Sequence, residues 1–328
     1  MSSAFGWGDI GHGAVGYIAQ GRLSPAAKRL VYDIIGPEPL AVSSVYPDQV
    51  RSDKRYAAFS PFHFVEIPYD QTGLDPAKRV DHDSDTIIQQ APALLTGDKL
   101  SRTQKMVLIR YLAHVVGDVH PPLHVGNGQD RGGNLCDVDW MDPDVRFDRG
   151  AHEMTYRRTN LHTVWDEDLI RYVQHEFQRA TGGGANGQKR WFGYLEMGDL
   201  ALKENAAIDF EKVTKDPPTV WYQESRDLHK IAYPNVAPYG MENPPYCKRV
   251  DPRTGKVVNG SYRKELVPKI EMAYIQRALP VLRKQVVLAG YRLAGMLNAM
   301  AEKARIAPAD EAAQKLELDA LLLKNPKP

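Results

Sequence analysis

The segment LAHVVGDVHPPLH, residues 112–124, constrains the fold more than any other part of the chain. It overlaps the end of the stretch 102–116, whose apolar residues recur at helical spacing and therefore predict a buried helix. His114 and Asp118 are four residues apart, so a helix places both on one face, one turn apart. The two prolines that follow end the helix, and His124 can fold back toward the same region.

A second pair repeats this geometry. The segment NLHTVWDEDL places His162 and Asp166 four residues apart on another expected helix. Either pair alone is typical of a surface ion pair or a hydrogen bond. Together with His12, His63 and His124, the pairs favour a metal site, because imidazole nitrogen and carboxylate oxygen are ligands that zinc accepts. Two or three zinc ions could use all of these residues.

The other histidines give weaker evidence of metal binding. His82 lies among acids in VDHDSD, where a solvated loop is the simpler interpretation. The remaining histidines have no partner at ligand spacing, and we expect them to lie at the surface or to support the site from outside: His120, His152, His175 and His229.

The coarse pattern along the chain is helical. We expect helices over 14–20, 24–35, 102–116, 160–177, 188–210, 219–232 and 268–304. Ser24 and Pro25 are typical of an N-cap and a first helical position. Residues 62–67 and 134–139 are expected as short strands or extended links, and 234–260 as a long surface loop. The charged, alanine-rich segment 305–328 is expected to be an added helical tail. A mainly α, single helical domain is the simplest account.

Composition narrows the class of protein. The chain has 328 residues, of which 43% are hydrophobic and 25% charged, so a packed core is expected. The formal net charge of +1 gives no strong field toward nucleic acid or membranes, which argues weakly against a sequence-blind duplex binder. No apolar run approaches the about 20 residues of a membrane-spanning helix. Cys136 and Cys247 leave open whether one disulfide forms.

The N-terminal segment GWGDIGH, residues 6–12, raises the question of processing. Ala4 and Gly6 are small residues at the third and first positions before Trp7, as at a signal-peptidase site. We therefore expect a secreted or periplasmic protein whose active form begins at Trp7. The apolar part of such a leader is absent from the sequence given. The free amine of Trp7 would then be a ligand in its own right.

Several segments, in this order, carry a resemblance to a known family: WGDIGH, PDQVR, FHFVEIP, LAHVVGDVHPPLH, DRGGN, NLHTVWD and GYRLAGMLN. They resemble the motifs of the secreted single-strand-specific zinc nucleases and 3′-nucleotidases. The resemblance implies the mainly α fold of the zinc phospholipase C/nuclease type with a few short strands. It places the nuclease domain at 7–304 and the helical tail at 305–328. Zinc-dependent phospholipase C shares this fold and is the nearest alternative.

The resemblance also implies a cluster of three zinc ions. Asp48, His63 and His114 would hold the first ion, and Asp118 would bridge it to a second. Trp7 and His12 would bind that second ion, Trp7 through its amine and carbonyl. The third ion would be held by His124, His162 and Asp166. The phospholipases have a similar pattern but with Glu at the last position, so Asp166 favours the nuclease.

The implied reaction is phosphoester hydrolysis by a hydroxide that bridges two zinc ions, with Asp48, Arg51 and Asp118 as the catalytic residues. Zinc lowers the pKa of bound water to about 7. Two ions about 3.5–4 Å apart can share the hydroxide and align it with phosphorus. The third ion would stabilise the leaving 3′-oxygen, so no separate general acid is required.

Substrate binding is implied for three residues. Arg51 would clamp the phosphate, since its planar donors suit phosphate oxygens. Phe64 would stack on a nucleobase and Glu66 would accept a hydrogen bond from a base amine. Asp130 and Asn134 of DRGGN would support His124 and the loop. The family usually has Asp where Glu66 stands, and Trp-Ala-Asp where this chain has Tyr-Pro-Asp at 46–48.

Three functions remain at this point. The leading one is cleavage of single-stranded DNA and RNA to 5′-nucleotides, with removal of 3′-phosphates from 3′-nucleotides. The second is phospholipase C activity on choline lipids, and the third is metal storage without turnover. No stable protein partner and no membrane span are inferred.

Overall fold

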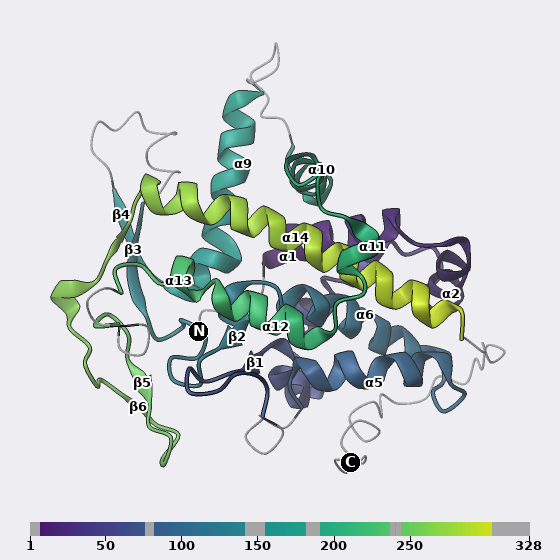
Figure 1. Ribbon diagram of the computed structural model, residues 1–328, viewed down its shortest axis with the longest axis horizontal. Coiled ribbons are helices and arrows are strands. Elements are labelled where there is room, and N and C mark those ends of the chain that lie inside the picture. The colour runs from purple at the N-terminus through teal and green to yellow at the C-terminus, as the bar shows by residue number, and fades with distance from the viewer. Residues whose placement is uncertain are drawn as a thin grey trace.

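The computed structural model describes residues 7–75, 82–141, 155–181, 191–236, 240 and 244–303. Over these ranges the protein is mainly helical, as expected, with a few short strands (Figure 1). The longer helices are α1 (Gly8–Gly21), α2 (Pro25–Ile35), α5 (Ser84–Thr96), α6 (Arg102–Asp118), α9 (Leu169–Ala180), α10 (Tyr194–Glu204), α12 (Pro218–Asp227) and α14 (Met272–Ala301). Shorter helical segments are α3 (Leu40–Ser43), α4 (Tyr46–Val50), η1 (Lys54–His63), η2 (Pro122–His124), α8 (Leu161–Thr163), η3 (Val164–Asp168), α11 (Phe210–Val213), α13 (His229–Ala232) and η4 (Lys264–Leu266).

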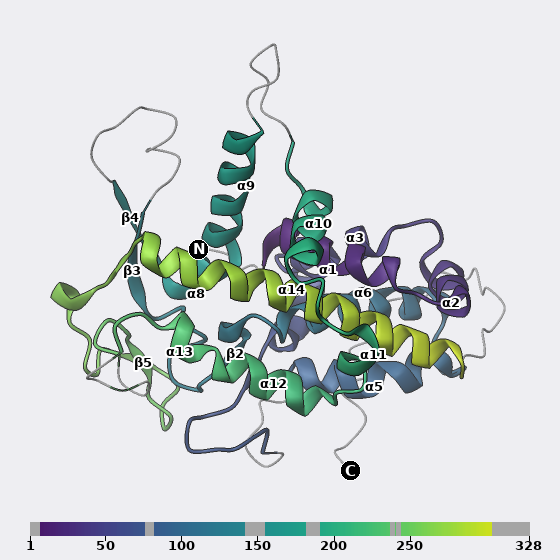
Figure 2. The same ribbon diagram turned by 45° about the horizontal axis from the view of Figure 1, so that its top comes forward.

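The long helix α14 runs across the molecule and packs against α1 and α10 (Figures 1 and 2). Gly290 allows the close approach to α1, because a Cβ there would lie 2.6 Å from Ile18 Cγ2. Near the other end of α14, the Tyr274 hydroxyl donates to the Ala232 carbonyl at 2.6 Å and accepts from Trp165 Nε1 at 2.8 Å. These contacts tie α14 to α13 and to η3, where part of the candidate site lies.

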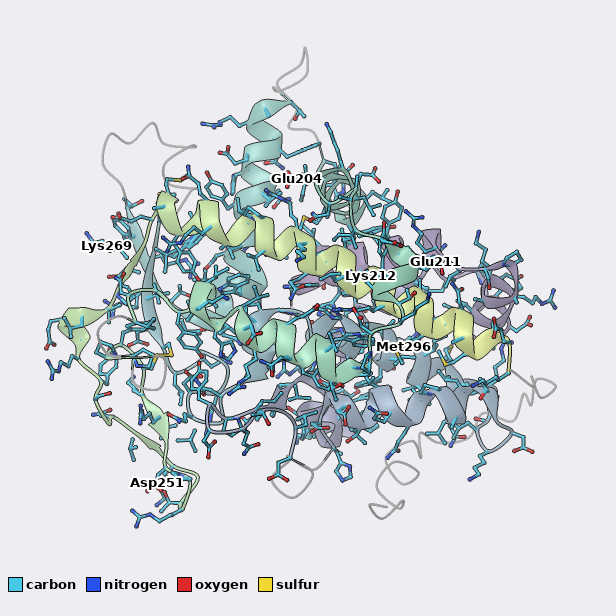
Figure 3. The ribbon with its side chains drawn as sticks, in the orientation of Figure 1. Glu204, Glu211, Lys212, Asp251, Lys269 and Met296 are labelled. Carbon is cyan, nitrogen blue, oxygen red and sulfur yellow. A yellow bond between two sulfur atoms is a disulfide. The ribbon has the colours of Figure 1, made fainter. Side chains whose placement is uncertain are left out.

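Most of the strands form small sheets toward one end of the molecule, and one pair lies nearer its middle (Figure 1). β1 (Val65–Glu66) pairs in parallel with β2 (Val125–Gly126). β3 (Asp137–Met141) pairs with β4 (Tyr156–Asn160) and β7 (Lys269–Ile270), and β5 (Arg249–Val250) pairs with β6 (Val257–Val258). Asp251 lies on the β5–β6 hairpin at the lower edge of Figure 3. A disulfide joins Cys136 to Cys247, which resolves the question that the sequence leaves open.

Some helix boundaries follow the sequence closely. Ser24 caps α2 by accepting from the Ala27 N–H at 3.1 Å, as the Ser-Pro pair predicts. The helix predicted over 102–116 extends to Asp118, so His114 and Asp118 share one helix. Residues 305–328 and His152 lie outside the described residues.

Other expectations needed correction. The segment 160–177 is not one regular helix, because Asn160 ends β4 and η3 is a wider π-helical turn before α9. The segment 188–210 begins its helix at Tyr194, where Glu196 accepts from the Gly193 N–H. The helix expected over 219–232 is divided into α12 and α13. The loop expected over 234–260 contains the β5–β6 hairpin, and 268–304 contains β7 before α14.

One long helix was missed. The polar run VDHDSD leads directly into α5, because the Asp83 side chain accepts from the Thr86 N–H at 3.1 Å and caps the helix. The Asp83 cap was the available signal. None of the described helices combines the length and apolar character that crossing a bilayer requires.

The close packing of α1 on α3 gives a stability prediction. A Cβ at Gly16 would overlap the carbonyl group of Leu40, whereas a Cβ at Gly21 would meet no atom within 4 Å. We expect Gly16→Ala to lower the free energy of unfolding by about 1–3 kcal/mol through overpacking. Gly21→Ala is the matched control and should unfold at or slightly above the wild-type midpoint in urea, because alanine favours a helix where it causes no overlap. Equal midpoints for both variants would contradict the packing argument.

Candidate metal centre

Asp118 is the centre of a buried cluster of imidazoles. Its Oδ2 lies 3.1 Å from His63 Nδ1 and 3.1 Å from His114 Nε2. Its Oδ1 lies 3.3 Å from His12 Nε2 and 3.3 Å from His124 Nδ1. Each oxygen therefore faces a different pair of rings, and the carboxylate is placed to serve two neighbouring cations.

Asp48, from α4, completes one side of this cluster. A carboxylate oxygen of Asp48 lies 3.6 Å from His114 Nε2 and 3.8 Å from His63 Nδ1. Both Asp48 oxygens are buried and have no hydrogen-bond partner among the described residues. Asp48, His63 and His114, which the resemblance assigns to one ion, therefore lie close together.

The second helical pair forms the other side with His124. The Asp166 carboxylate lies 2.8 Å from His162 Nε2 and 3.3 Å from His124 Nε2. The two rings stack with their centroids 4.8 Å apart. The donor atoms of this group lie within 4.8 Å of one another. Two further groups meet the same limit: His12, His114 and Asp118, and Asp48, His63 and His114.

Trp7 lies at the start of α1, beside this cluster. It is fully buried, with a left-handed backbone at φ 33°, and its carbonyl accepts from the Gly11 N–H at 3.1 Å. It lines the same cavity as Asp48 and Asp166. Residues 1–6 lie outside the described ranges, so the expected free amine of Trp7 stays a prediction.

Backbone carbonyls orient three of the imidazoles. Each ring donates its Nδ1–H to a carbonyl, which fixes the tautomer and leaves Nε2 with a free lone pair. His114 donates to Ser44 at 2.7 Å. His124 donates to the His63 carbonyl, and His162 to that of Gly132, both at 2.8 Å. This is the arrangement that metal-binding histidines require.

The DRGGN loop supports the cluster through its backbone. The Asp130 carboxylate accepts from the Gly133 N–H at 2.8 Å, from Asn127 Nδ2 at 2.9 Å and from the Tyr233 hydroxyl at 2.8 Å. The loop is thereby held so that Gly132 accepts from His162, whereas the sequence predicts support of His124. Asn134 donates from Nδ2 to the Arg131 carbonyl at 2.9 Å and so stabilises the turn itself.

Burial and charge shift the pKa values within the cluster. Burial raises the pKa of Asp48 to about 7, although the neighbouring His114 opposes the rise. Burial would also raise the pKa of Asp118, but His114 and His124 hold it well below its usual range. Burial lowers the pKa of His12 and of His63 to about 4 each. These two rings are therefore neutral at pH 7. Burial also acts to lower the pKa of His114 and of His124, but the charge of Asp118 outweighs it and raises these values to about 8 and about 9. These two rings therefore have to lose a proton when they bind a metal ion.

The donor set fits divalent metal ions. Several buried side-chain atoms have no hydrogen-bond partner among the described residues: His12 Nε2, both oxygens of Asp48, Asp118 Oδ1, His124 Nε2 and both oxygens of Asp166. Leaving such atoms unpartnered is costly unless a cation coordinates them. Mixed imidazole and carboxylate donors match zinc, and three groups of this kind are present among the described residues.

The cluster opens into two cavities. The main cleft, about 1080 Å³, is lined by the start of α1, by Asp48 and Asp166, and by the α9 residues Ile170, Arg171 and Gln174. The side cavity, about 350 Å³, is lined by His63, Phe64, Glu66, Leu123, His124, Gly126, Gly128, Gly132, His162 and Val250. Arg51, Arg131 and Asn134 line both cavities.

Phe64 and Glu66 share one face of the short segment at β1. Val65 between them is fully buried in the core, so its two neighbours point to the side cavity. Burial raises the pKa of Glu66, and the charge of Asp130 adds to the rise. An aromatic ring and a hydrogen-bonding carboxyl group therefore face the same small space.

Two histidines outside the cluster have clear structural partners. His229 donates from Nε2 to the Pro122 carbonyl at 2.8 Å, and the Tyr69 hydroxyl donates to its Nδ1 at 2.8 Å. It therefore holds η2 next to His124. His120 is fully buried, with Nδ1 2.6 Å from the Val116 carbonyl, and is not a surface residue.

Comparison with known proteins agrees with this geometry. The sequence model of the S1/P1 nuclease family matches residues 7–302. The chain is 27% identical to Endonuclease 3 of Arabidopsis thaliana over 313 residues, which cover 91% of this chain and 90% of the relative. It is 23% identical to Nuclease S1 of Aspergillus oryzae over 317 residues, covering 91% and 93%. It is 25% identical to Nuclease P1 of Penicillium citrinum over 308 residues, covering 89% and 97%.

The unpartnered buried donors predict that metal removal destabilises the fold. We expect a chelator to lower the thermal midpoint by at least about 5 °C, and added zinc to restore it, because a ligand that binds only the folded state stabilises it. Asp118→Asn should reduce the metal content measured by elemental analysis. Asp33→Asn, at a surface ion pair with Arg29, is the control and should keep it. An unchanged midpoint after metal depletion would contradict the metal centre.

Proposed function

Because this chain belongs to the S1/P1 nuclease family and is a hydrolytic nuclease, we propose that it uses three zinc ions to cleave single-stranded DNA and RNA to 5′-nucleotides. We include in this proposal the removal of 3′-phosphates from 3′-nucleotides. The observation that carries it is the set of three donor groups around Asp118 and Asp166 at the junction of the two cavities.

The described residues supply a ligand set for each ion. Asp48, His63 and His114 would hold one zinc, and Asp118 would be shared with the zinc at His12, where Trp7 also lies. The third would be held by His124, His162 and Asp166. Bound zinc would lower the pKa of water and stabilise negative charge on the phosphate and leaving oxygen. Asp48 and Asp118 hold this cluster together and are placed among the catalytic residues on that ground.

The protein's own residues orient the substrate. Arg51 lines both cavities next to Asp48, so its guanidinium can bind the phosphate with paired donors. Phe64 can stack on a base in the side cavity. A cavity of about 350 Å³ accepts one base that has left its stack, and a base held in a duplex cannot enter it. The side cavity therefore accounts for a preference for single strands.

The alternatives are less well supported. Phospholipase C activity is not favoured, because the matching family model is that of the S1/P1 nucleases. Metal storage without turnover does not account for a main cleft and a side cavity that meet at the cluster.

Secretion or export to the periplasm, with cleavage before Trp7, remains part of the proposal. It is supported by the burial of Trp7 at the start of α1, in the same cavity as Asp48 and Asp166. Intact-mass analysis of natively exported protein tests it. An active, zinc-replete species that retains Met1 would contradict the processing step.

The third donor group supplies the test of catalysis. We expect His162→Ala and Asp166→Ala each to lower kcat/KM on heat-denatured DNA at least about 100-fold, because a missing ligand disturbs the charge at the leaving oxygen. Initial rates of acid-soluble nucleotide release measure this effect. His175→Ala is the matched control, since His175 is half-buried on α9 and is not among the residues lining either cavity. Wild-type rates in both site variants would remove the third group from the mechanism.

Glu66 gives a pH prediction for base preference. The ionised carboxylate only accepts hydrogen bonds and matches the N1–H and N2–H of guanine, whereas the protonated acid can also donate to adenine N1. Because the pKa of Glu66 is raised, the adenine-to-guanine ratio of kcat/KM on 3′-nucleotides should fall as pH rises through it. Glu66→Gln always presents a donor, so its ratio should stay high and independent of pH.

Glu66→Asp provides the control for this prediction. It keeps an ionisable carboxyl group, so the ratio should again fall with pH. A flat ratio in the wild-type protein would show that Glu66 does not contact the base.

A further inference from the structure

Arg131 occupies the boundary between the two cavities. It lines both of them, together with Arg51 and Asn134. Arg51 comes from the end of α4, close in sequence to Asp48, whereas Arg131 comes from the DRGGN loop. The two guanidinium groups therefore approach the same opening from different elements.

The Arg131 side chain is exposed, and no hydrogen bond or ion pair involves its guanidinium among the described residues. The neighbouring Arg171 in the main cleft differs, because Glu167 neutralises it at 3.1 Å. The cleft also contains the acids Asp9 and Asp166. An uncompensated cation at this position is the local feature that favours a second anionic group of the substrate.

The backbone holds Arg131 in a conformation that is unfavourable for a side chain. Its φ is 54°, in the left-handed region, and the next two glycines also have positive φ. The Arg131 carbonyl accepts from the Asn134 N–H at 3.2 Å and from Asn134 Nδ2 at 2.9 Å. Glycine would relieve the strain, so an arginine here indicates that the side chain has a role.

We propose that Arg131 binds a second phosphate of the nucleic acid, one nucleotide away from the phosphate that is cleaved. This inference rests on the proposed function and names the polynucleotide backbone as the ligand of that same site. Arg51 binds the reacting phosphate, the base of one nucleotide occupies the side cavity, and Arg131 at the cavity boundary contacts the neighbouring phosphodiester. Arg131 thereby favours polynucleotides over substrates that contain a single phosphate.

The test compares two substrates, the dinucleoside monophosphate TpT, which has only the reacting phosphate, and the oligonucleotide (dT)8. Arg131→Gln removes the charge but keeps a Cβ, so the left-handed backbone is equally unfavourable in both proteins. Arg131→Lys keeps the charge. We expect Arg131→Gln to lower the (dT)8-to-TpT ratio of kcat/KM about ten-fold, and Arg131→Lys to restore most of it. The slope of log kcat/KM against log salt for (dT)8 should become shallower by about 0.7 in Arg131→Gln.

Two further variants make the comparison specific. Arg29→Gln removes one exposed charge from α2 and should leave the ratio and the salt slope at wild-type values. Arg51→Gln should lower kcat/KM on both substrates to a similar extent, because both contain the reacting phosphate.

Equal losses on the two substrates in Arg131→Gln would place Arg131 at the base or the reacting phosphate and overturn the inference. Wild-type values on both substrates would overturn it as well. A wild-type protein that cleaves neither substrate would instead contradict the proposed function, and the inference would fail with it.

Discussion

The burial of the Asp118 carboxylate among four imidazoles is the constraint on which the rest of the site depends. Asp118 is fully buried, and its oxygens lie 3.1–3.3 Å from nitrogens of His12, His63, His114 and His124. A buried carboxylate is unfavourable unless positive charge compensates it, and although burial opposes ionisation of Asp118, the charges of His114 and His124 hold its pKa well below the usual range. The histidines come from α1, η1, α6 and η2, so one charge brings together elements that are distant in sequence.

The elements around this carboxylate also fix the direction of the rings. The carbonyls of Ser44, His63 and Gly132 each accept an Nδ1–H from one imidazole. These carbonyls belong to segments that are themselves fixed: Ser44 donates from its hydroxyl to the His12 carbonyl at 2.7 Å, and Asp130 holds the turn at Gly132. The site is therefore rigid because each ligand is oriented by backbone that another part of the fold holds in place.

The sequence predicts local geometry well wherever a helix fixes it. Two residues four apart on a helix share a face, so the pairs at His114 and His162 could be placed from spacing alone. The convergence of these pairs with His63 and Asp48 depends on tertiary packing. His63 was grouped with the pairs only by its chemistry, and Asp48 was indicated only by the resemblance to a family. The predicted free amine of Trp7 depends on removal of residues 1–6, and these residues lie outside the described ranges.

Contacts made by backbone atoms could not be predicted in this way. A carbonyl such as that of Ser44 has no residue signature, because every residue carries the same acceptor. The π-helical turn at η3 shifts the register between His162 and α9, and helical periodicity cannot show it. The sequence left open whether His229 lies at the surface or supports the site from outside, because its partner, the Pro122 carbonyl, is more than a hundred residues away in sequence.

The DRGGN loop shows how the orientation of the metal centre and the recognition of substrate can be separated within one turn. Gly132 cannot accept a Cβ, because it would overlap the Leu123 carbonyl, and its own carbonyl is committed to His162. Asp130 is committed to the turn. Arg131 is the exposed position between them, so its side chain can change without moving the imidazole. The structure therefore allows substrate preference to vary at Arg131 while the geometry of the ligands stays fixed.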